Sequence, residues 1–295
     1  MKLEINDITK TFGEKKVLKG ITLCAESGTA LGILGRNGAG KTTTLRILMN
    51  VFPADSGTIC LEGEKIDYER IRIGYLPEER GLYPKKTIIE QLVYFARLKG
   101  MGRQEAVKAA DQWLEHLEMG AFRNKRLDTL SKGNQQKIQL ITAVIHDPQM
   151  IILDEPFSGL DPVNAALLKD VVREEVDRGK IVLFSSHQMG YIEEFCDRIA
   201  ILNGGEMVLK GRVEEIKKMY PRDRLLIRSL QETDIAKAYP SACEHAQQGL
   251  IFHLEQPSCK REMMAQLTDE FDIDEISVLE PSLSDIFVEY TRDRI

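Results

Sequence analysis

The sequence predicts an α/β protein whose main domain combines an N-terminal antiparallel β layer, a parallel core sheet and a helical subdomain, followed by a small α+β C-terminal domain. Three observations support this prediction. A glycine-rich loop stands between an apolar run and a helical run, two continuous apolar runs flank a helical stretch, and the pattern changes beyond Gly211. With 295 residues, of which 43% are hydrophobic and 29% charged, the chain can bury a full core.

The N-terminal residues predict the antiparallel β layer. Apolar residues alternate over residues 3–8, a turn is expected at residues 12–14, and the alternation resumes over residues 17–23. A third short strand over residues 57–61 extends this layer.

A glycine-rich loop lies between a predicted strand, residues 30–34, and a predicted helix, residues 43–49. The loop reads Gly35-Arg36-Asn37-Gly38-Ala39-Gly40-Lys41-Thr42 and fits the pattern G-x-x-x-x-G-K-[ST] without a mismatch. Its glycines let successive backbone N–H groups turn toward an anion, and the helix N-terminus adds partial positive charge. Lys41 can then reach the β- and γ-phosphates, and Thr42 can place its hydroxyl on Mg²⁺. The chain is therefore predicted to bind a nucleotide.

Helical spacing of apolar residues begins at residue 87 and continues to residue 117. This region opens the helical subdomain, which we expect over about residues 87–146. Trp113 falls on the apolar face, and we expect it in the core.

Two short, continuous apolar runs, residues 150–153 and 181–184, predict strands buried on both faces. The helical stretch between them, residues 163–176, gives the βαβ pattern of a parallel sheet.

Beyond Gly211 a helix (213–219) and a linker (220–223) are expected. The elements then predicted are a strand (225–230), a helix (234–239), a strand (250–254), a helix (261–271), a strand (275–279) and a helix (283–291). With residues 243–247 as a possible extra strand, this order resembles a βαββαβ module. We expect the domains to span residues 1–219 and 223–295.

Two carboxylates, Asp154 and Glu155, end the first apolar run. The carboxyl end of a parallel strand lies beside the phosphate loop in such sheets. There Asp154 can hold Mg²⁺ through water, and Glu155 can face the attacking water.

Three further segments carry polar residues of interest. Residues 130–137 read LSKGNQQK, and Ser131 is predicted to cap a helix whose free N–H groups form an anion site. Residues 158–162 read SGLDP and predict a tight turn, with Pro162 opening the next helix. Residues 185–187 read SSH and end the following strand; a histidine such as His187, taken alone, is more often structural.

Composition excludes several classes of protein. The net charge of −6 arises from 40 basic and 46 acidic residues spread along the sequence, so no basic stripe indicates a nucleic-acid partner. No signal peptide is expected at the N-terminus, and no run approaches the roughly 18 apolar residues of a membrane span. The five cysteines show no C-x-x-C spacing, which favours reduced, buried thiols over disulfides or a metal site.

In this order, the phosphate loop, LSKGNQQK, ILDEP, SGLD and SSH resemble the nucleotide-binding subunit of an ABC transporter. The resemblance covers residues 1 to about 215. It implies the ABC ATPase form of the P-loop NTPase fold, with ATP and Mg²⁺ as ligands. The residues implied to bind the phosphates and Mg²⁺ are those from Gly35 through Thr43, among them Asn37, Gly38, Ala39, Gly40, Lys41 and Thr42.

The same resemblance implies roles within one chain for four further residues. Phe12 is expected to stack on adenine, and Asp154 is expected to hold the metal. Glu155 is expected to be the general base that polarises water, while His187 is expected to contact the γ-phosphate.

It also implies residues that act across a dimer. Ser131 and Gly133 are expected to reach the γ-phosphate of the nucleotide bound by the partner subunit, and Asp161 is expected to lie at the dimer interface.

The chain departs from the family pattern at two places. Lys132 and Asn134 stand within the segment that usually reads LSGGQ, and Glu78 replaces the metal-sensing Gln in the loop over residues 74–84. A carboxylate at Glu78 can still ligate Mg²⁺, although it adds negative charge beside the triphosphate. Together with the segment over residues 280–287, these variants resemble the sodium-extrusion and related ABC-2-type exporter ATPases of bacteria.

The function expected is that of a cytoplasmic ATPase subunit, held at the inner face of the membrane by a separate transmembrane permease and driving export. It is expected to pair with a second copy of itself or with a paralogous ATPase subunit. One alternative is a soluble ABC ATPase acting on ribosomes or DNA, although the chain has one cassette and no long coiled-coil insertion. Others are a regulatory module without turnover, which would lack the base or the lysine, and an importer subunit. The transported substrate stays open, because its path belongs to the permease.

Overall fold

The computed structural model describes residues 1–79, 81–158, 160–246 and 248–291. The chain forms two compact units: Met1–Val213 with Phe287–Ile295, and Glu214–Ile286. The first unit contains, in chain order, β1 (Lys2–Phe12), β2 (Lys15–Glu26), β3 (Thr29–Gly35), α1 (Lys41–Leu48), β4 (Ser56–Leu61), β5 (Glu64–Lys65), β6 (Ile73–Leu76), α2 (Ile88–Leu98), α3 (Arg103–His116), the 3₁₀ helices η1 (Gly120–Phe122) and η2 (Leu127–Thr129), α4 (Lys132–Val144), β7 (Met150–Asp154), α5 (Pro162–Asp177), β8 (Ile181–Ser186), α6 (Met189–Phe195), β9 (Arg198–Asn203) and β10 (Glu206–Arg212). Helix α7 (Val213–Lys218) leads into the second unit, which contains β11 (Arg224–Arg228), α8 (Glu232–Ala238), β12 (Cys243–Ala246), β13 (Gly249–His253), η3 (Pro257–Cys259), α9 (Lys260–Glu270) and β14 (Glu275–Val278), and α10 (Leu283–Thr291) is divided between the units.

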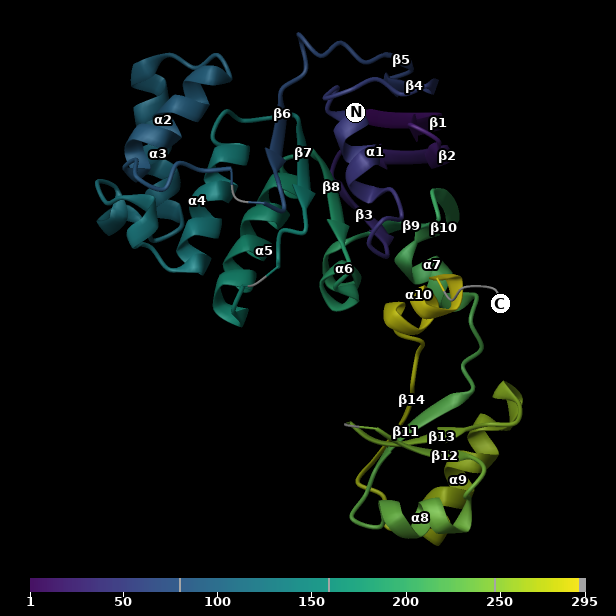
Figure 1. Cartoon of the computed structure of the whole chain (residues 1–295). Helices are drawn as coiled ribbons and strands as arrows, with labels where there is room; N and C mark the ends of the chain where they lie inside the picture. Colours follow the sequence, from purple (N-terminus) through teal and green to yellow (C-terminus); the bar gives the residue numbers. More distant parts are fainter. Residues whose placement is uncertain (80, 159, 247, 292–295) are drawn as a thin grey trace. The chain divides into compact units, whose positions relative to one another are not determined.

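The core sheet of the first unit has the strand order β10-β9-β3-β8-β7-β6 (Figure 1). Its strands β6, β7, β8, β3 and β9 are parallel, and β10 adds an antiparallel edge. Every residue of β7 and β8 is buried, which explains their continuous apolar runs. The predicted parallel core is confirmed, and the carboxyl ends of β3, β7 and β8 meet at one edge.

The predicted antiparallel layer is also confirmed, as a sheet of order β2-β1-β4-β5. Helix α1 packs between this sheet and the core sheet, since its buried Leu45 and Leu48 join residues of both sheets in one hydrophobic cluster. That cluster fixes the helix that follows the glycine-rich loop.

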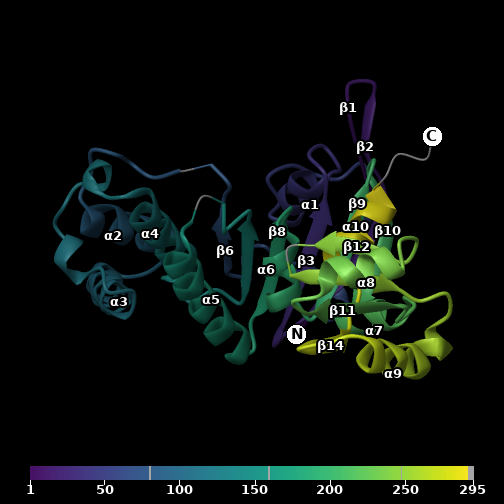
Figure 2. The same cartoon turned by 90° about the horizontal axis from the view of Figure 1, so that it is seen from below.

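The stretch of helical periodicity over residues 87–117 forms two helices, α2 and α3, and α4 follows as the helix that Ser131 was predicted to cap (Figure 2). A capping box at Thr87 and Glu90 begins α2, and Gly100, with φ 91°, separates α2 from α3. The expectation that Trp113 lies in the core is wrong, because its side chain is only partly buried and its ring packs edge-on against His116.

Helix α4 packs directly on strand β6. A Cβ atom at Gly74 of β6 would overlap the backbone carbonyl oxygen of Ala143 in α4. Only a residue without a side chain allows this approach.

The second unit has a four-stranded antiparallel sheet of order β12-β13-β11-β14, and its elements follow the predicted βαββαβ order. Ile235 of α8 and Leu267 of α9 are buried against Leu225 and Leu250 of the sheet. The predicted strand over residues 243–247 is present to Ala246, and residue 247 lies outside the described residues.

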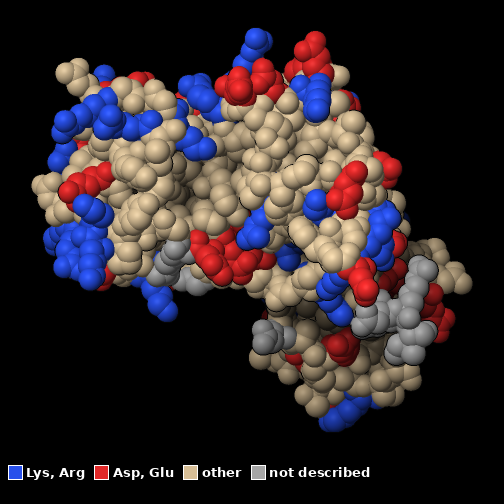
Figure 3. Space-filling model, turned by 45° about the horizontal axis from the view of Figure 1, so that its top comes forward, with Lys and Arg blue, Asp and Glu red and all other residues tan. Residues whose placement is uncertain are grey.

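The remaining expectations concern surface charge, thiols and membrane segments. Figure 3 shows groups of basic and acidic side chains on the drawn face.

All five cysteines are free, but only Cys196 is buried and the others are half-buried, so the expectation of buried thiols holds for one of them. None of the helices in the described residues has the length and apolar character needed to span a bilayer.

Candidate nucleotide-binding site

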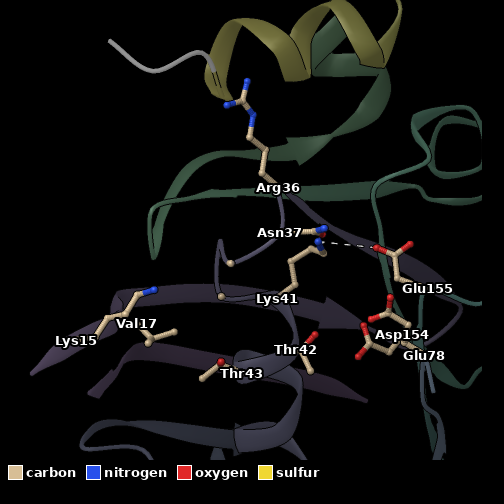
Figure 4. Close-up of a pocket in the computed structure, with 12 residues that line it drawn as sticks. Lys15, Val17, Arg36, Asn37, Lys41, Thr42, Thr43, Glu78, Asp154 and Glu155 are labelled. Carbon is tan, nitrogen blue, oxygen red and sulfur yellow. Dashed lines mark ion pairs between the residues drawn. The ribbon is translucent and has the colours of Figure 1, made fainter. Parts of the chain in front are cut away.

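A cavity of about 370 Å³ opens at the glycine-rich loop between β3 and α1 (Figure 4). It is lined by Lys15, Val17, Arg36, Asn37, Gly38, Gly40, Lys41, Thr42, Thr43, Glu78, Asp154 and Glu155. Seven of the nine residues from Gly35 through Thr43 line this cavity, all except Gly35 and Ala39. The three predicted carboxylates, Glu78, Asp154 and Glu155, line it as well.

The backbone of the loop requires glycine at two positions. Gly38 and Gly40 have φ angles of 82° and 109°, in the left-handed region that side chains disfavour. At Gly40 a Cβ atom would also lie 2.6 Å from Cδ2 of Leu18. Loop backbone can therefore approach a phosphate closely, and the Gly205 amide of the β9–β10 turn donates to the Ala39 carbonyl from behind.

Lys41 is buried at the first turn of α1. Its Nζ donates to the Gly35 carbonyl at 2.7 Å and lies 3.8 Å from Oε1 of Glu155. Figure 4 shows these two side chains pointing toward each other across the cavity. A phosphate bound in this cavity would lie close to the ammonium group of Lys41, which already points toward the Glu155 carboxylate.

The other oxygen of Glu155 has several partners. Oε2 accepts a hydrogen bond from Ser186 Oγ at 3.1 Å and lies 2.9 Å from His187 Nδ1. Glu155 is 5% exposed and has a φ of 50°, a strained backbone conformation of the kind found at functional sites.

Thr42, Glu78 and Asp154 line the same end of the cavity (Figure 4). Asp154 is buried at the end of β7 and accepts a hydrogen bond from Ser185 Oγ. Burial, and then the charge of Asp154, raises the pKa of the nearby Tyr75 hydroxyl to about 12.

This oxygen-rich set fits Mg²⁺. Mg²⁺ is usually bound by one or two carboxylates, a hydroxyl and substrate phosphates, and not by an all-protein cage. No group of three or more His, Cys, Asp or Glu side chains suited to a metal occurs within the described ranges.

Phe12 does not line the cavity. Its ring is half exposed at the end of β1, where it packs edge-on against Phe52 with the ring centres 5.4 Å apart. The ammonium of Lys10 lies 5.6 Å from the centres of both rings. His187 likewise lies outside the cavity lining, with its side chain 54% exposed and directed at Glu155.

Ser131, Gly133 and Asp161 form a second group that also lies outside the cavity lining. Ser131 is the predicted N-cap of α4, its Oγ accepting from the Asn134 amide at 3.3 Å. Asp161 caps α5 and accepts from the amide and side chain of Asn164, which lower the pKa of its exposed carboxyl. Residue 159 of the predicted turn lies outside the described residues.

Gly133 connects these two helix starts. A Cβ atom at Gly133 would overlap the side-chain amide of Asn164. The first turns of α4 and α5 are therefore in contact.

The sequence did not single out Lys15, Val17, Ser185, Ser186 or Asn164. Lys15 and Val17 follow the predicted turn of the β layer, and nothing in their pattern marks them as cavity residues. The available signal for the serines was their place in the SSH motif at the end of a predicted parallel strand, whose carboxyl end lies at the same sheet edge as Asp154 and Glu155.

Known proteins of similar sequence and fold identify the family of this chain. The family model described as ABC transporter matches residues 18–158, and the model described as ATP-binding protein DrrA1-3-like, C-terminal domain, matches residues 211–291. The chain is 42% identical over 290 residues to the uncharacterized ABC transporter ATP-binding protein YhaQ of Bacillus subtilis (strain 168), with 97% of each chain covered.

A second relative is Nod factor export ATP-binding protein I of Burkholderia lata, 34% identical over 213 residues, covering 71% of this chain and 70% of the relative. Among solved structures, the dimeric structure of MJ0796, a bacterial ABC transporter cassette, has a TM-score of 0.65 and 25% identity, covering 72% of this chain and 98% of that one. The phosphate loop, the carboxylates beside it and these matches agree, and the chain belongs to the ATP-binding proteins of ABC transporters.

Proposed function

We propose that the chain hydrolyses ATP in the cavity at the phosphate loop, with Glu155 as the general base. The observation that carries this proposal is the position of the Glu155 carboxylate, buried and 3.8 Å from Lys41 Nζ. Lys41 and the loop amides would neutralise charge on the transferred phosphoryl group, while Glu155 orients and accepts a proton from water. His187 is proposed to hold Glu155 and contact the γ-phosphate.

Thr42, Asp154 and Glu78 are proposed to hold Mg²⁺. When bound, the ion supplies positive charge that offsets the phosphate oxygens. Residues 35–43 are proposed to bind the phosphates, and Phe12 is proposed to stack on adenine from the end of β1.

We also propose that two such subunits share their sites. Ser131, Gly133 and Asp161 are proposed to reach the nucleotide of the partner chain from the first turns of α4 and α5, which contact each other through Gly133 and Asn164. The solved structure of the MJ0796 cassette is dimeric, which supports the same arrangement. The partner can be a second copy or a paralogous ATPase subunit.

We further propose that the pair works with a separate transmembrane permease at the cytoplasmic face of the membrane and powers export. The name of the Nod factor relative, which includes the word export, supports this direction.

The test of the catalytic proposal is Glu155→Gln. The amide keeps the size of the side chain but cannot accept a proton, so turnover should fall by about 10²–10⁴ while ATP affinity is kept. With Mg-ATP the variant should elute as a dimer in size-exclusion chromatography. Hydrolysis near the wild-type rate would contradict the assignment.

The test of the transport proposal is recovery of the tagged wild-type chain from detergent-solubilised membranes, followed by mass spectrometry. We expect a polytopic membrane protein in stoichiometric amount, whose addition changes the ATPase rate. Recovery with ribosomes or DNA in its place would favour the soluble alternative.

A further inference from the structure

Strand β8 ends in two buried serines beside the two carboxylates that follow β7. Ser185 and Asp154 are paired residues of the parallel ladder, and the Glu155 amide donates to the Ser185 carbonyl at 2.9 Å. The exposed fractions of Ser185 and Ser186 are 0% and 1%. Both hydroxyls are therefore fixed within the protein and shielded from solvent.

Each serine serves a different carboxylate. Ser185 Oγ donates to Oδ1 of Asp154, and Ser186 Oγ donates to Oε2 of Glu155 at 3.1 Å. The Gln188 amide donates to Ser186 Oγ at 3.0 Å, so this oxygen accepts from the backbone and directs its own proton at the carboxylate.

The bond from Ser186 also decides which oxygen of Glu155 stays available. Ser186, the His187 amide and the His187 ring all approach Oε2, whereas Oε1 faces Lys41. The left-handed backbone conformation of Glu155 needs surrounding contacts that hold it in place, and these contacts to Oε2 are among them.

We propose that Ser185 and Ser186 are a pair of positioning residues, one for each carboxylate. Ser185 orients Asp154 toward Mg²⁺, and Ser186 holds Oε2 of Glu155 so that Oε1 is presented to the attacking water. Consecutive strand residues point in opposite directions, so one strand end serves both groups. This inference rests on the roles proposed above for Asp154 and Glu155.

The experiment compares Ser185→Ala and Ser186→Ala in steady-state ATP hydrolysis, with kcat, the KM for ATP and the half-saturating Mg²⁺ concentration measured separately. Losing a hydrogen bond behind a metal ligand or a catalytic group typically costs about 10–100-fold in metal affinity or activity. Ser186→Ala should therefore lower kcat about 10-fold or more, with little change in the half-saturating Mg²⁺ concentration. Ser185→Ala should raise that Mg²⁺ concentration by about 10-fold and recover most of its kcat at saturating Mg²⁺.

Matched variants separate positioning from loss of structure. Ser185→Thr and Ser186→Thr keep a hydroxyl, so each should restore the parameter that the corresponding alanine variant changes. Thr29→Ala removes a strand hydroxyl that bonds only the Glu26 carbonyl in the described part of the chain, and it should match the wild type. Melting temperatures of all variants report whether the fold is kept.

Reference variants distinguish failure of this inference from failure of the site assignment. If Glu155→Gln lowers kcat and Asp154→Asn raises the Mg²⁺ requirement while both serine-to-alanine variants stay within about twofold of the wild type, the positioning roles are wrong. They are also wrong if both alanine variants change the same parameter equally, or if threonine does no better than alanine. If the two carboxylate variants behave like the wild type, the roles of Asp154 and Glu155 fall, and the inference falls with them.

Discussion

Three carboxylates, Glu78, Asp154 and Glu155, line a cavity that we propose receives a triphosphate. Negative charges that line one cavity repel each other, and the size of the repulsion depends on how strongly the surroundings screen it. Lys15, Arg36 and Lys41 line the same cavity, so a bound triphosphate would add negative charge that these side chains do not offset alone. The Mg²⁺ ion is therefore expected to matter more for this chain than for one with a neutral residue at position 78.

Glu78→Gln tests that expectation. The substitution removes one negative charge beside the proposed metal site, so the protein should stay folded and bind ATP but show a shifted Mg²⁺ dependence of hydrolysis. The measurement is an Mg²⁺ titration of ATPase activity at fixed ATP. Superimposable titrations for the two proteins would mean that Glu78 does not reach the metal.

His146 is a buried histidine kept neutral by its surroundings. Its Nε2 lies 3.2 Å from the Ile73 carbonyl oxygen, and its Nδ1 has no hydrogen-bond partner among the described residues. Burial, and then the charge of Lys99, lowers the pKa of His146 from 6.5 to about 4. An unfolded chain takes up a proton at this side chain near pH 6.5, but the folded chain does so only near pH 4. The free energy of unfolding is therefore highest above pH 6.5 and falls as the pH drops from 6.5 to 4.

His146→Gln should remove this part of the pH dependence. From the two pKa values, the wild type should lose about 2 kcal/mol of stability at pH 5 through His146 alone. The difference in melting temperature between pH 7.5 and pH 5 should shrink in the variant by several degrees, since about 2–4 °C corresponds to 1 kcal/mol for a domain of this size. Thr29→Ala, which changes no titratable group, is the control and should keep the wild-type difference. An equal pH response of wild type and His146→Gln would exclude the buried neutral state.

At the scale of elements, the first turns of α4 and α5 interlock through a glycine and an asparagine. Asn164 donates its side-chain amide to Asp161 at 2.6 Å and leaves no room for a side chain at Gly133. The helix start that carries Ser131 is thereby joined to the cap of α5. A substitution in the first turn of α4 should therefore also affect the first turn of α5.

A double-mutant cycle of Gly133→Ala and Asn164→Ala measures this coupling. The new methyl group should displace Asn164 and weaken the cap at Asp161, costing about 1 kcal/mol or more of stability. In the double variant the obstructing side chain is gone, so the methyl group should cost much less. Urea denaturation of the four proteins provides the free energies, and strictly additive values would show that the two residues do not interact.

The elements were largely predictable because their signals are local. The buried runs of β7 and β8, the capping residues Ser131 and Asp161 and the glycine-rich loop can each be recognised within a few residues. The separation of α2 from α3 was not predicted, because apolar spacing continues across Gly100.

The predicted site residues also divide into those with a local signal in the sequence and those whose contacts have none. Lys41, Asp154 and Glu155 fall in one cavity, since motifs at the ends of neighbouring parallel strands must converge. Contacts between distant segments, such as Ser186 with Glu155, leave no trace in either segment alone. The prediction for Trp113 was wrong for a similar reason. Helical spacing shows which face of a helix is apolar, but it does not show how far another element covers each residue on that face.

At the scale of the whole molecule, one chain carries both halves of the proposed site. The phosphate loop lines the nucleotide cavity, whereas Ser131 lies outside its lining. In the dimer proposed above, two facing chains would form two equivalent sites, each with Lys41 from one chain and Ser131 from the other.

Mixing two inactive variants tests this arrangement in a homodimer. Lys41→Ala removes the lysine from both sites, and Ser131→Arg blocks both opposing helix starts, so each variant alone should be nearly inactive. A mixed dimer regains one intact site, and loss of a single donor can cost about 10²–10³ in rate, so partial recovery should be clear. The measurement is ATPase activity of the 1:1 mixture, with mixed dimers confirmed by differential tags. Strong activity of Ser131→Arg by itself would contradict the shared site.

The approach of α4 to β6 at Gly74 constrains how this sequence can vary. The atom that a side chain would strike is a backbone oxygen of Ala143, which no rotamer change can move aside. Gly120, by contrast, has open space where its side chain would be. Among related chains, glycine should therefore be kept at position 74, whereas other residues should occur at position 120. A chain with another residue at position 74 would need α4 to lie farther from the core sheet.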